Sequence, residues 1–371
     1  MATPCSKAVM AIPGVADEAL LARDRALTAL DEGDPAAALA LVGEGLAVLE
    51  AAGLGGGPDA AAVLVTRAEI EESLGRFGAA TATAAAALVL LEAAVAEGGA
   101  EDCLLLWCQA QERLAGLERL AGEFDAAAAR LSAAADQAAA AFGEASPAVV
   151  SAANALGVVY KYAADFDAAE RAYRRALAAA GGQADPLILA GLLHNLGGLA
   201  HARGDFTGGI PLAERGVALR TGALGAGHPD VARDWNALGA LYHLARRFGD
   251  AAQAYDRALA VFADRYGPDH FEVAMTCANL AVLAADQGRG QEAEALGRRS
   301  LRILEAVLGP QDAEVGLTLL NLAAVVAEQG RRAEAAGLMA RAATILEARL
   351  PHDHPHVVAA GQALERLGTP S

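Results

Sequence analysis

The sequence has little of what builds β-sheets or disulfide frameworks. Aromatic residues make up only 4% of its 371 residues, and β-branched residues are also sparse, which argues against a sheet protein. None of the four cysteines belongs to a Cys-x-x-Cys pair. Two of them fall inside predicted helices as small apolar residues do. We therefore expect reduced thiols in a cytoplasmic protein.

Long apolar segments are also missing. The first fifteen residues contain no convincing apolar run or cleavage site, so no secretory signal is evident. The longest apolar runs cover residues 79–91 and 186–202, and neither has the roughly 18 strongly apolar residues that a bilayer span requires. Both runs are interpreted as buried helices, which predicts a soluble protein without a membrane partner.

Positive charge is scarce. The chain has 46 acidic and 29 basic residues, a formal net charge of −17, and residues 1–102 alone hold 16 acids and 5 bases. The average field of such a protein repels a polyanion, which excludes nucleic acid as the expected partner.

What the sequence does contain is alanine and a long internal repeat. Alanine is the best helix former and lets helices approach closely. Leucines recur at intervals of 42 residues, with one interval of 40, at Leu114, Leu156, Leu196, Leu238, Leu280 and Leu322. Alanine, glycine or serine stands thirteen and twenty residues after each of them. Small residues at fixed positions predict helical hairpins whose helices pack closely.

The clearest single copy of the repeat runs from Trp235 through Leu238, Gly239, Tyr242, Ala251, Tyr255 and Ala258. This order resembles the tetratricopeptide repeat pattern. The unit of 42 residues, with Gly and Pro in exit loops such as 224–230, 266–270 and 308–312, is similar to the kinesin-light-chain class of these repeats. The resemblance implies an all-α fold, a right-handed α-solenoid superhelix of about eight helical hairpins plus a C-terminal capping helix.

The repeat also suggests a division of the chain. Residues 1–18 are predicted to be a flexible N-terminus, and 19–107 to hold two degenerate repeats, around 19–54 and 61–97. Regular repeats are predicted over 108–350, and 351–371 to form a capping helix, centred on 357–367, and a tail. Atypical terminal repeats are expected because one of their faces meets water. The prediction amounts to about 17 helices.

The resemblance implies that the first helix of each hairpin lines a concave groove, and helical periodicity then selects candidate binding residues. One asparagine lies one or two residues before the repeat leucine in each of five successive repeats: Asn154, Asn195, Asn236, Asn279 and Asn321. Amides can bind the backbone of an extended peptide. Alternatively, each amide bonds to a neighbouring helix and sets repeat geometry only.

Basic groups fall on the same predicted face: Arg113, Arg119, Lys161, His194, His201, Arg233 and His243. In an acidic protein they suggest a peptide ligand with an acidic segment or a free C-terminal carboxylate. The alternative is a solvated face whose basic groups pair with acids of the next helix. Towards the C-terminus the face becomes apolar at Met275, Val282, Leu317, Leu320 and Ala324, which would suit a hydrophobic anchor side chain or a dimer contact.

No arrangement of a nucleophile with a base, and no pair of facing carboxylates, indicates catalysis. The His-Asp-His-Pro-His segment at 352–356 could suggest a metal site, but it occupies the exit-loop position where His-Pro-Asp stands at 228–230. We therefore expect neither enzymatic activity nor a cofactor. The sequence favours a protein–protein interaction scaffold that binds a partner peptide. The alternatives are a regulatory solenoid that senses a peptide or metabolite and, less favoured, an enzyme with an unrecognised site.

Overall fold

The computed structural model describes residues 14–96, 101–182 and 184–368, and within these ranges all regular structure is α-helical. Seventeen helices are present in the described residues, as eight hairpins and one final helix. The predicted all-α solenoid is thus confirmed. The chain divides into two compact units, residues 1–184 and 185–371, and each is considered by itself.

The first unit contains four hairpins. Its helices are Val15–Asp31 (α1), Pro35–Ala51 (α2), Pro58–Ser73 (α3), Phe77–Ala96 (α4), Glu101–Leu120 (α5), Phe124–Phe142 (α6), Pro147–Tyr162 (α7) and Phe166–Ala180 (α8). The predicted flexible segment 1–18 lies mostly outside the described residues, as does Cys5, but α1 already begins at Val15.

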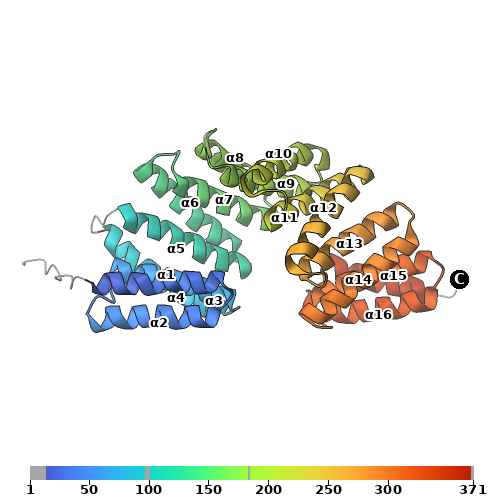
Figure 1. Ribbon diagram of the computed structural model, residues 1–371, viewed down its shortest axis with the longest axis horizontal. Coiled ribbons are helices and arrows are strands. Elements are labelled where there is room, and N and C mark those ends of the chain that lie inside the picture. Colours follow the sequence, from blue (N-terminus) through green and yellow to red (C-terminus); the bar gives the residue numbers. More distant parts are fainter. Residues whose placement is uncertain (1–13, 97–100, 183, 369–371) are drawn as a thin grey trace, which may run out of the picture. The chain divides into compact units, whose positions relative to one another are not determined.

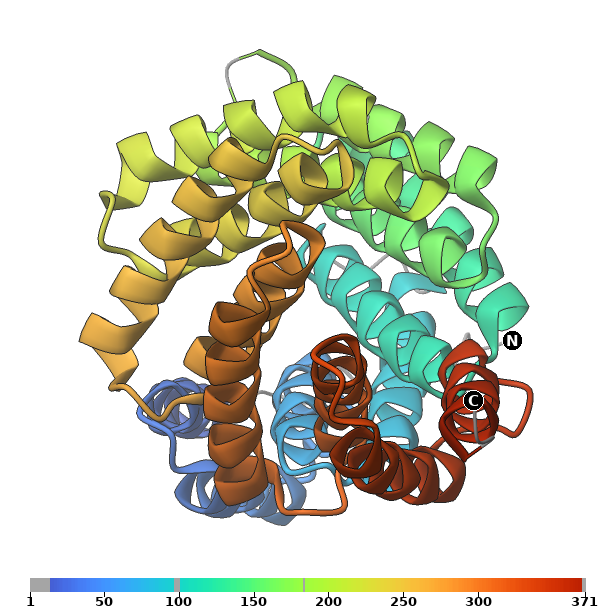
Figure 2. The ribbon, with the colours of Figure 1, turned by 90° about the vertical axis from the view of Figure 1, so that its right-hand side faces the viewer.

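The second unit contains four hairpins and the capping helix. Its helices are Pro186–Arg203 (α9), Phe206–Leu224 (α10), Pro229–Leu244 (α11), Phe248–Tyr266 (α12), Phe271–Asp286 (α13), Gly290–Leu308 (α14), Ala313–Glu328 (α15), Arg332–Arg349 (α16) and Pro355–Gly368 (α17). In both units consecutive helices pack side by side and run in opposite directions (Figures 1 and 2).

Local sequence explains where the helices begin. Proline is the first residue of α3, α7, α9 and α11, where its missing N–H costs no hydrogen bond. Polar side chains directly before a helix accept from its free N–H groups: Asp205 accepts from Gly208 N, and His228 Nδ1 from Asp230 N. His354 Nδ1 accepts from His356 N in the same way, so this segment starts α17.

The turn inside each hairpin requires a left-handed residue. Glycine fills that place in six hairpins, for example Gly204 with φ of 77°. Ala164 and Arg246 adopt φ of 59° in the other two. A side chain in this conformation costs roughly 1–2 kcal/mol, so these two turns hold local strain.

Small residues allow the two helices of a hairpin to touch, as predicted. A Cβ atom on Gly157 would lie 2.5 Å from the ring of Tyr173, and one on Gly239 would lie 2.7 Å from the ring of Tyr255. Both tyrosines are fully buried. Each ring therefore occupies space that only a glycine on the facing helix leaves free.

The C-terminal helix covers the last hairpin, as expected of a capping helix. Val357 and Ala360 of α17 are buried in one apolar cluster with Met339, Ala343 and Leu346 of α16. This contact removes the apolar face of α16 from water, which a terminal repeat needs for solubility.

The interpretation of residues 79–91 as a buried helix is wrong in part. The run belongs to α4, whose apolar outer side is exposed: Val89 is 65% and Phe77 is 50% exposed. Among the described residues, α4 is the one helix long and apolar enough to span a membrane by length and composition, and 28% of its apolar window is buried. One such helix is weak evidence for a membrane span. The other run, in α9, buries its leucines from Leu189 to Leu199, whereas Leu187 and Ile188 at its start are exposed.

Candidate functional site

In each unit the first helices of successive hairpins pack against one another. In the first unit α1 contacts α3, α3 contacts α5, and α5 contacts α7. In the second unit α9 contacts α11, α11 contacts α13, and α13 contacts α15. We call the exposed side of these first helices the inner wall of each unit. The three hollows described next lie along these two walls.

A hollow of about 700 Å³ lies on the inner wall of the first unit. All its lining residues belong to the first helices α1, α3, α5 and α7. Arg113 crosses it, with its two Nη atoms each 2.9 Å from a carboxylate oxygen, of Glu69 and of Glu72. Glu112 accepts a 2.6 Å hydrogen bond from Ser151 Oγ, and burial raises the pKa of its carboxyl. This wall carries more acid than base.

Two cations lie close together at the C-terminal ends of α5 and α7. The Arg119 guanidinium carbon is 4.7 Å and Lys161 Nζ is 5.5 Å from the ring centroid of Tyr162. Burial, followed by repulsion from Arg119, lowers the pKa of Lys161. Within the described ranges neither cation is in an ion pair, so this part of the wall favours an anion.

On the inner wall of the second unit, a hollow of about 230 Å³ lies between α9, α10 and α11. His194 and His201, two of the predicted residues, both line it. At one end His194 Nδ1 is 2.8 Å from Asp234 Oδ1, and Arg220 Nε is 3.2 Å from Asp234 Oδ2. Asp234 is 3% exposed. The Arg220 guanidinium therefore offsets the negative charge of this buried carboxylate.

A second hollow of this wall, about 180 Å³, lies between α13, α14 and α15. Its floor is apolar, from alanine, glycine, leucine and valine, and Thr318 and Asn321 add polar groups. Asp286 and Glu328 also line it. Val282 and Ala324, predicted as part of an apolar inner face, are among its walls.

The predicted asparagine row is only partly a row. Asn279 Nδ2 donates to Asn236 Oδ1 across 3.2 Å, which links α13 to α11. Asn321 is exposed and lines the 180 Å³ hollow. Asn154 and Asn195 are half-buried, and each has an interaction within the fold. For Asn236 and Asn279, a bond between neighbouring repeats accounts for the amides without a ligand.

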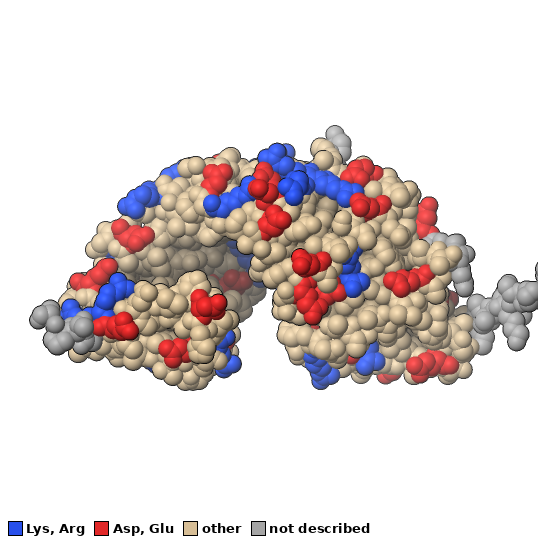
Figure 3. Space-filling view, turned by 180° about the vertical axis from the view of Figure 1, so that it is seen from behind, with Lys and Arg blue, Asp and Glu red and all other residues tan. Residues whose placement is uncertain are grey.

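Most of the predicted basic stripe is paired with acids. Arg233 Nε is 2.9 Å from Glu272 of the next first helix, and the same side chain contacts Asp230. His243 Nε2 is 2.8 Å from Asp286 Oδ2. With Arg113 and His194 already described, four of the seven residues match the alternative of a self-neutralised face. On the face drawn in Figure 3, acidic and basic side chains lie next to each other in several places.

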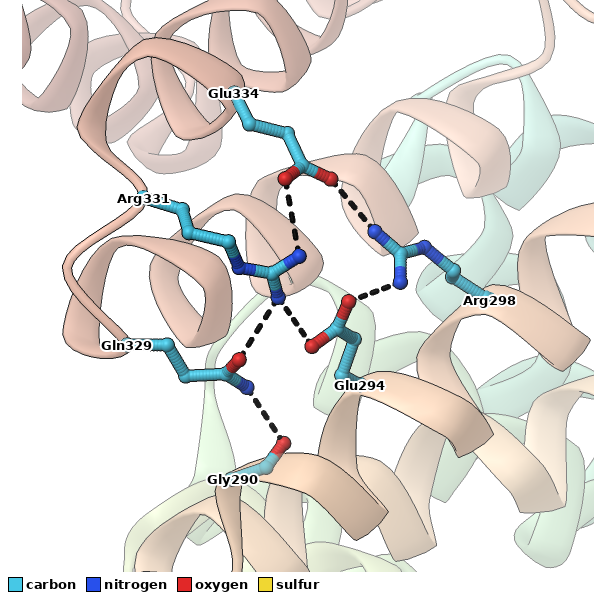
Figure 4. A network of polar contacts seen from close by, with 6 residues as sticks. All are labelled: Gly290, Glu294, Arg298, Gln329, Arg331 and Glu334. Carbon is cyan, nitrogen blue, oxygen red and sulfur yellow. Dashed lines mark hydrogen bonds and ion pairs between the residues drawn. The ribbon is translucent and has the colours of Figure 1, made fainter.

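A polar network joins the seventh and eighth hairpins (Figure 4). Arg331, in the turn before α16, contacts Glu294 of α14, Gln329 and Glu334. Arg298 of α14 contacts Glu294 and lies 2.6 Å from Glu334. The Arg331 guanidinium, which donates to Glu294, lowers the pKa of that carboxyl. Gln329 Nε2 donates to Gly290 O across 2.9 Å, which fixes the two hairpins together.

The described residues contain no group of three or more His, Cys, Asp and Glu side chains able to hold a metal ion. Cys103, Cys108 and Cys277 are buried free thiols. Burial, with a smaller contribution from Glu112, raises the pKa of Cys108 to about 11. A thiol of this kind is not an activated nucleophile.

A tetratricopeptide repeat family model matches residues 108–181, 188–264 and 271–348, more than half of the chain. The chain belongs to the tetratricopeptide repeat family. This tetratricopeptide repeat protein is similar to the crystal structure of BtubC (BKLC) from P. vanneervenii, with 26% identity and a TM-score of 0.52 over 60% of this chain and 89% of that one. No curated protein sequence matches it.

Two further solved structures are similar to this tetratricopeptide repeat protein. The apo quorum sensor NprR from B. thuringiensis has 13% identity and a TM-score of 0.67, over 91% of this chain and 89% of that one. A putative kinesin light chain from Podosopora anserina has 19% identity and a TM-score of 0.49, over 54% and 95%. The likeness to NprR concerns the fold alone. The resemblance to kinesin-light-chain-like repeats stated from the sequence is confirmed.

Sequence reasoning missed the acids of the second unit's wall. Asp234 stands four residues before Leu238, and Asp286 and Glu328 each stand six residues after a repeat leucine. Only the last two repeats carry an acid six residues after the repeat leucine. A comparison of acidic residues in the same register would have found this signal.

Proposed function

We propose that the protein is an interaction scaffold that binds an extended segment of a partner protein along its inner walls. The observation that carries this proposal is the 700 Å³ hollow, lined by the first helices of four successive hairpins. A trough that crosses four helices suits a chain segment, since successive side chains of an extended peptide can meet successive helices. No catalytic arrangement competes with this use of the wall in the described residues.

The chemistry at Arg119 and Lys161 supports a carboxylate in the partner. The two cations repel one another and have no acid partner within the described residues. A carboxylate of the partner, from an acidic side chain or the C-terminus, would offset that repulsion and form charge-assisted hydrogen bonds. Of the seven basic residues predicted to bind an acidic ligand, we therefore propose Arg119 and Lys161 as the carboxylate site.

Affinity capture from the native cell, followed by peptide mapping of the captured protein, tests the scaffold. The mapped segment should then bind the purified protein less tightly when Arg119 and Lys161 are both replaced by glutamine. Arg233→Gln is the matched control, because that arginine already pairs with Glu272 and Asp230. Equal loss of affinity in the control would contradict the carboxylate site.

A small molecule captured without any protein would instead favour the sensing alternative. Two hollows of the second unit, about 230 and 180 Å³, are below the roughly 300–1,000 Å³ of sites that enclose a drug-sized ligand, and their size suits single side chains of a peptide or protein partner. The hollow of about 490 Å³ between α13, α14 and α15 falls within that range, so it is the place in this unit where a captured small molecule would be sought.

A further inference from the structure

One position of the second helix, seventeen residues after the repeat leucine, holds a tyrosine in some repeats and a small residue in others. The residue seventeen positions after the repeat leucine is Tyr173 in the fourth hairpin and Tyr255 in the sixth, where each ring fills the space over a glycine. In the fifth and seventh hairpins the same position is held by Ala213 and Gly297. A Cβ on Gly197 would meet Ala213 alone, whose Cβ would be 3.5 Å away. Where the ring is missing, the helices leave a gap.

Two hollows of the second unit, of about 230 and 180 Å³, are those gaps. They are lined by residues of the same repeat positions: Gly197 and Ala281, Ala213 and Gly297, His201 and Ala285, Leu241 and Val325. Between them lies the sixth hairpin, where Tyr255 closes the equivalent space. The inner wall of the second unit thus has two equivalent sockets, two repeats apart.

The sockets differ in charge. In the socket between α9 and α11 the only acid, Asp234, is balanced by Arg220 and His194, and the remaining walls are mainly glycine and alanine. The socket between α13 and α15 has two acids, Asp286 and Glu328, and no basic residue among its lining residues.

Both acids lie at helix C-termini, where the local potential is negative and favours a cation. Asp286 is the last residue of α13 and Glu328 the last residue of α15, where the helix dipole already carries about half a negative charge. Asp286 has His243 as a partner, but Glu328 is in no ion pair among the described residues. Glu328 also lines an adjoining hollow of about 490 Å³, so its carboxylate lies where a ligand can reach it.

The volume of the socket matches that of an aliphatic stem. At about 30 Å³ for each water-sized group, a volume of 180 Å³ has room for about six non-hydrogen atoms. This is the size of a lysine or arginine side chain, whose stem packs on apolar surface while the charged end stays near water. Ala281, Ala293, Leu322 and Val325 would contact the stem, and Glu328 the charged end.

We propose that the socket between α13 and α15 binds one lysine or arginine side chain of the partner segment, and that the socket between α9 and α11 binds an uncharged apolar one. This rests on the proposed function, and it specifies the partner's chemistry. The network of Figure 4 joins α14 to the turn after α15 and thereby holds the charged socket in shape before the ligand arrives.

The test uses random twelve-residue peptides displayed on phage and selected on the full-length protein. Selected peptides should be enriched in lysine or arginine at one fixed position. Replacement of that residue by norleucine keeps the stem and removes the charge. It should weaken binding to the wild-type protein by roughly fivefold or more, since a partly desolvated charged contact exceeds an exposed ion pair. It should have little effect on binding to the Asp286→Asn/Glu328→Gln variant.

The matched control is Glu347→Gln, which removes one negative charge from the exposed side of α16. The norleucine peptide should lose as much affinity for this variant as for the wild type. In Ala213→Tyr the new ring fills the apolar socket, where Gly197 leaves room for it. Peptides selected on this variant should no longer be enriched in an apolar residue at a fixed position. Its circular dichroism and melting temperature establish that it is folded.

The outcomes separate the two proposals. Peptides that bind the inner wall but show the same norleucine loss on both proteins would overturn the charged socket and leave the scaffold in place. If no peptide is selected, the scaffold proposal is contradicted. The socket is then tested alone with n-butylguanidinium, whose binding by ligand-observed NMR should disappear in Asp286→Asn/Glu328→Gln. Equal binding to both proteins, or none, would refute it.

Discussion

Replacement of Gly239 by alanine should destabilise the protein, whereas the same change at Gly197 should not. The two glycines hold the same repeat position in the same unit. A Cβ at 239 would lie 2.7 Å from the Tyr255 ring, but one at 197 would lie 3.5 Å from its nearest neighbour, Ala213 Cβ. The comparison isolates the effect of one aromatic ring.

The expected magnitudes follow from these distances. Overpacking of a core costs about 1–3 kcal/mol, whereas alanine in place of a helical glycine contributes about 1 kcal/mol. Gly239→Ala should therefore lower the free energy of unfolding by up to about 2 kcal/mol. Gly197→Ala should raise it by up to about 1 kcal/mol, since 3.5 Å is ordinary contact.

Urea unfolding followed by circular dichroism measures both changes. In a Tyr255→Ala background, where the ring is removed, Gly239→Ala should lose its penalty, and this coupling identifies the ring as the cause. If Gly239→Ala proved as stable as Gly197→Ala in the wild-type background, the assignment of a filled and an empty position would be refuted.

Three further predictions concern other parts of the fold. Ala164→Gly should raise the free energy of unfolding by about 0.5–1 kcal/mol, because it relieves a φ of 59°; no gain in urea midpoint would contradict the strain. Asp234→Ala should lower the free energy of unfolding by about 3 kcal/mol, because the buried Arg220 loses the carboxylate that it contacts. Thermal unfolding measures this change, and an unchanged midpoint would show that the ion pair does not stabilise the fold. Burial, with a hydrogen bond to Glu214, raises the pKa of Tyr242 from 10.0 to about 12, so its contribution to stability is complete below pH 10 and lost as pH rises through 12. Ultraviolet titration against Tyr242→Phe measures this, and a phenol that ionises near pH 10 would disprove it.

The repeat pattern predicted the fold well, because the positions of the helices depend on residues that are close together in the sequence. The leucine spacing located the first helices, and proline or a capping side chain marks where helices such as α9 and α11 begin. The capping helix followed from the need to cover the last apolar face, which α17 does. The predicted division at residue 107 stays a prediction.

The binding residues were harder to predict, because pairing depends on contacts between repeats. The sequence placed Arg233 and His243 on the inner wall but did not show that Glu272 and Asp286, about forty residues later, neutralise them. It also failed to predict the exposed apolar side of α4, since the sequence does not show whether another element covers the outer face of a second helix. The alternation of Tyr173 and Tyr255 with Ala213 and Gly297 was visible in the sequence. That each tyrosine ring fills the space over a glycine of the facing helix could be seen only in the structure.

The most direct measurement of where a partner lies is photo-crosslinking to defined positions. A photoreactive residue is placed at Ala240 or Ala324, which line the two hollows of the second unit, and, as a control, at Val307 on the second helix α14. The mapped partner segment should crosslink to Ala240 and Ala324 and leave Val307 unlabelled. Crosslinks at Val307 with none at the other two positions would contradict binding along the inner wall.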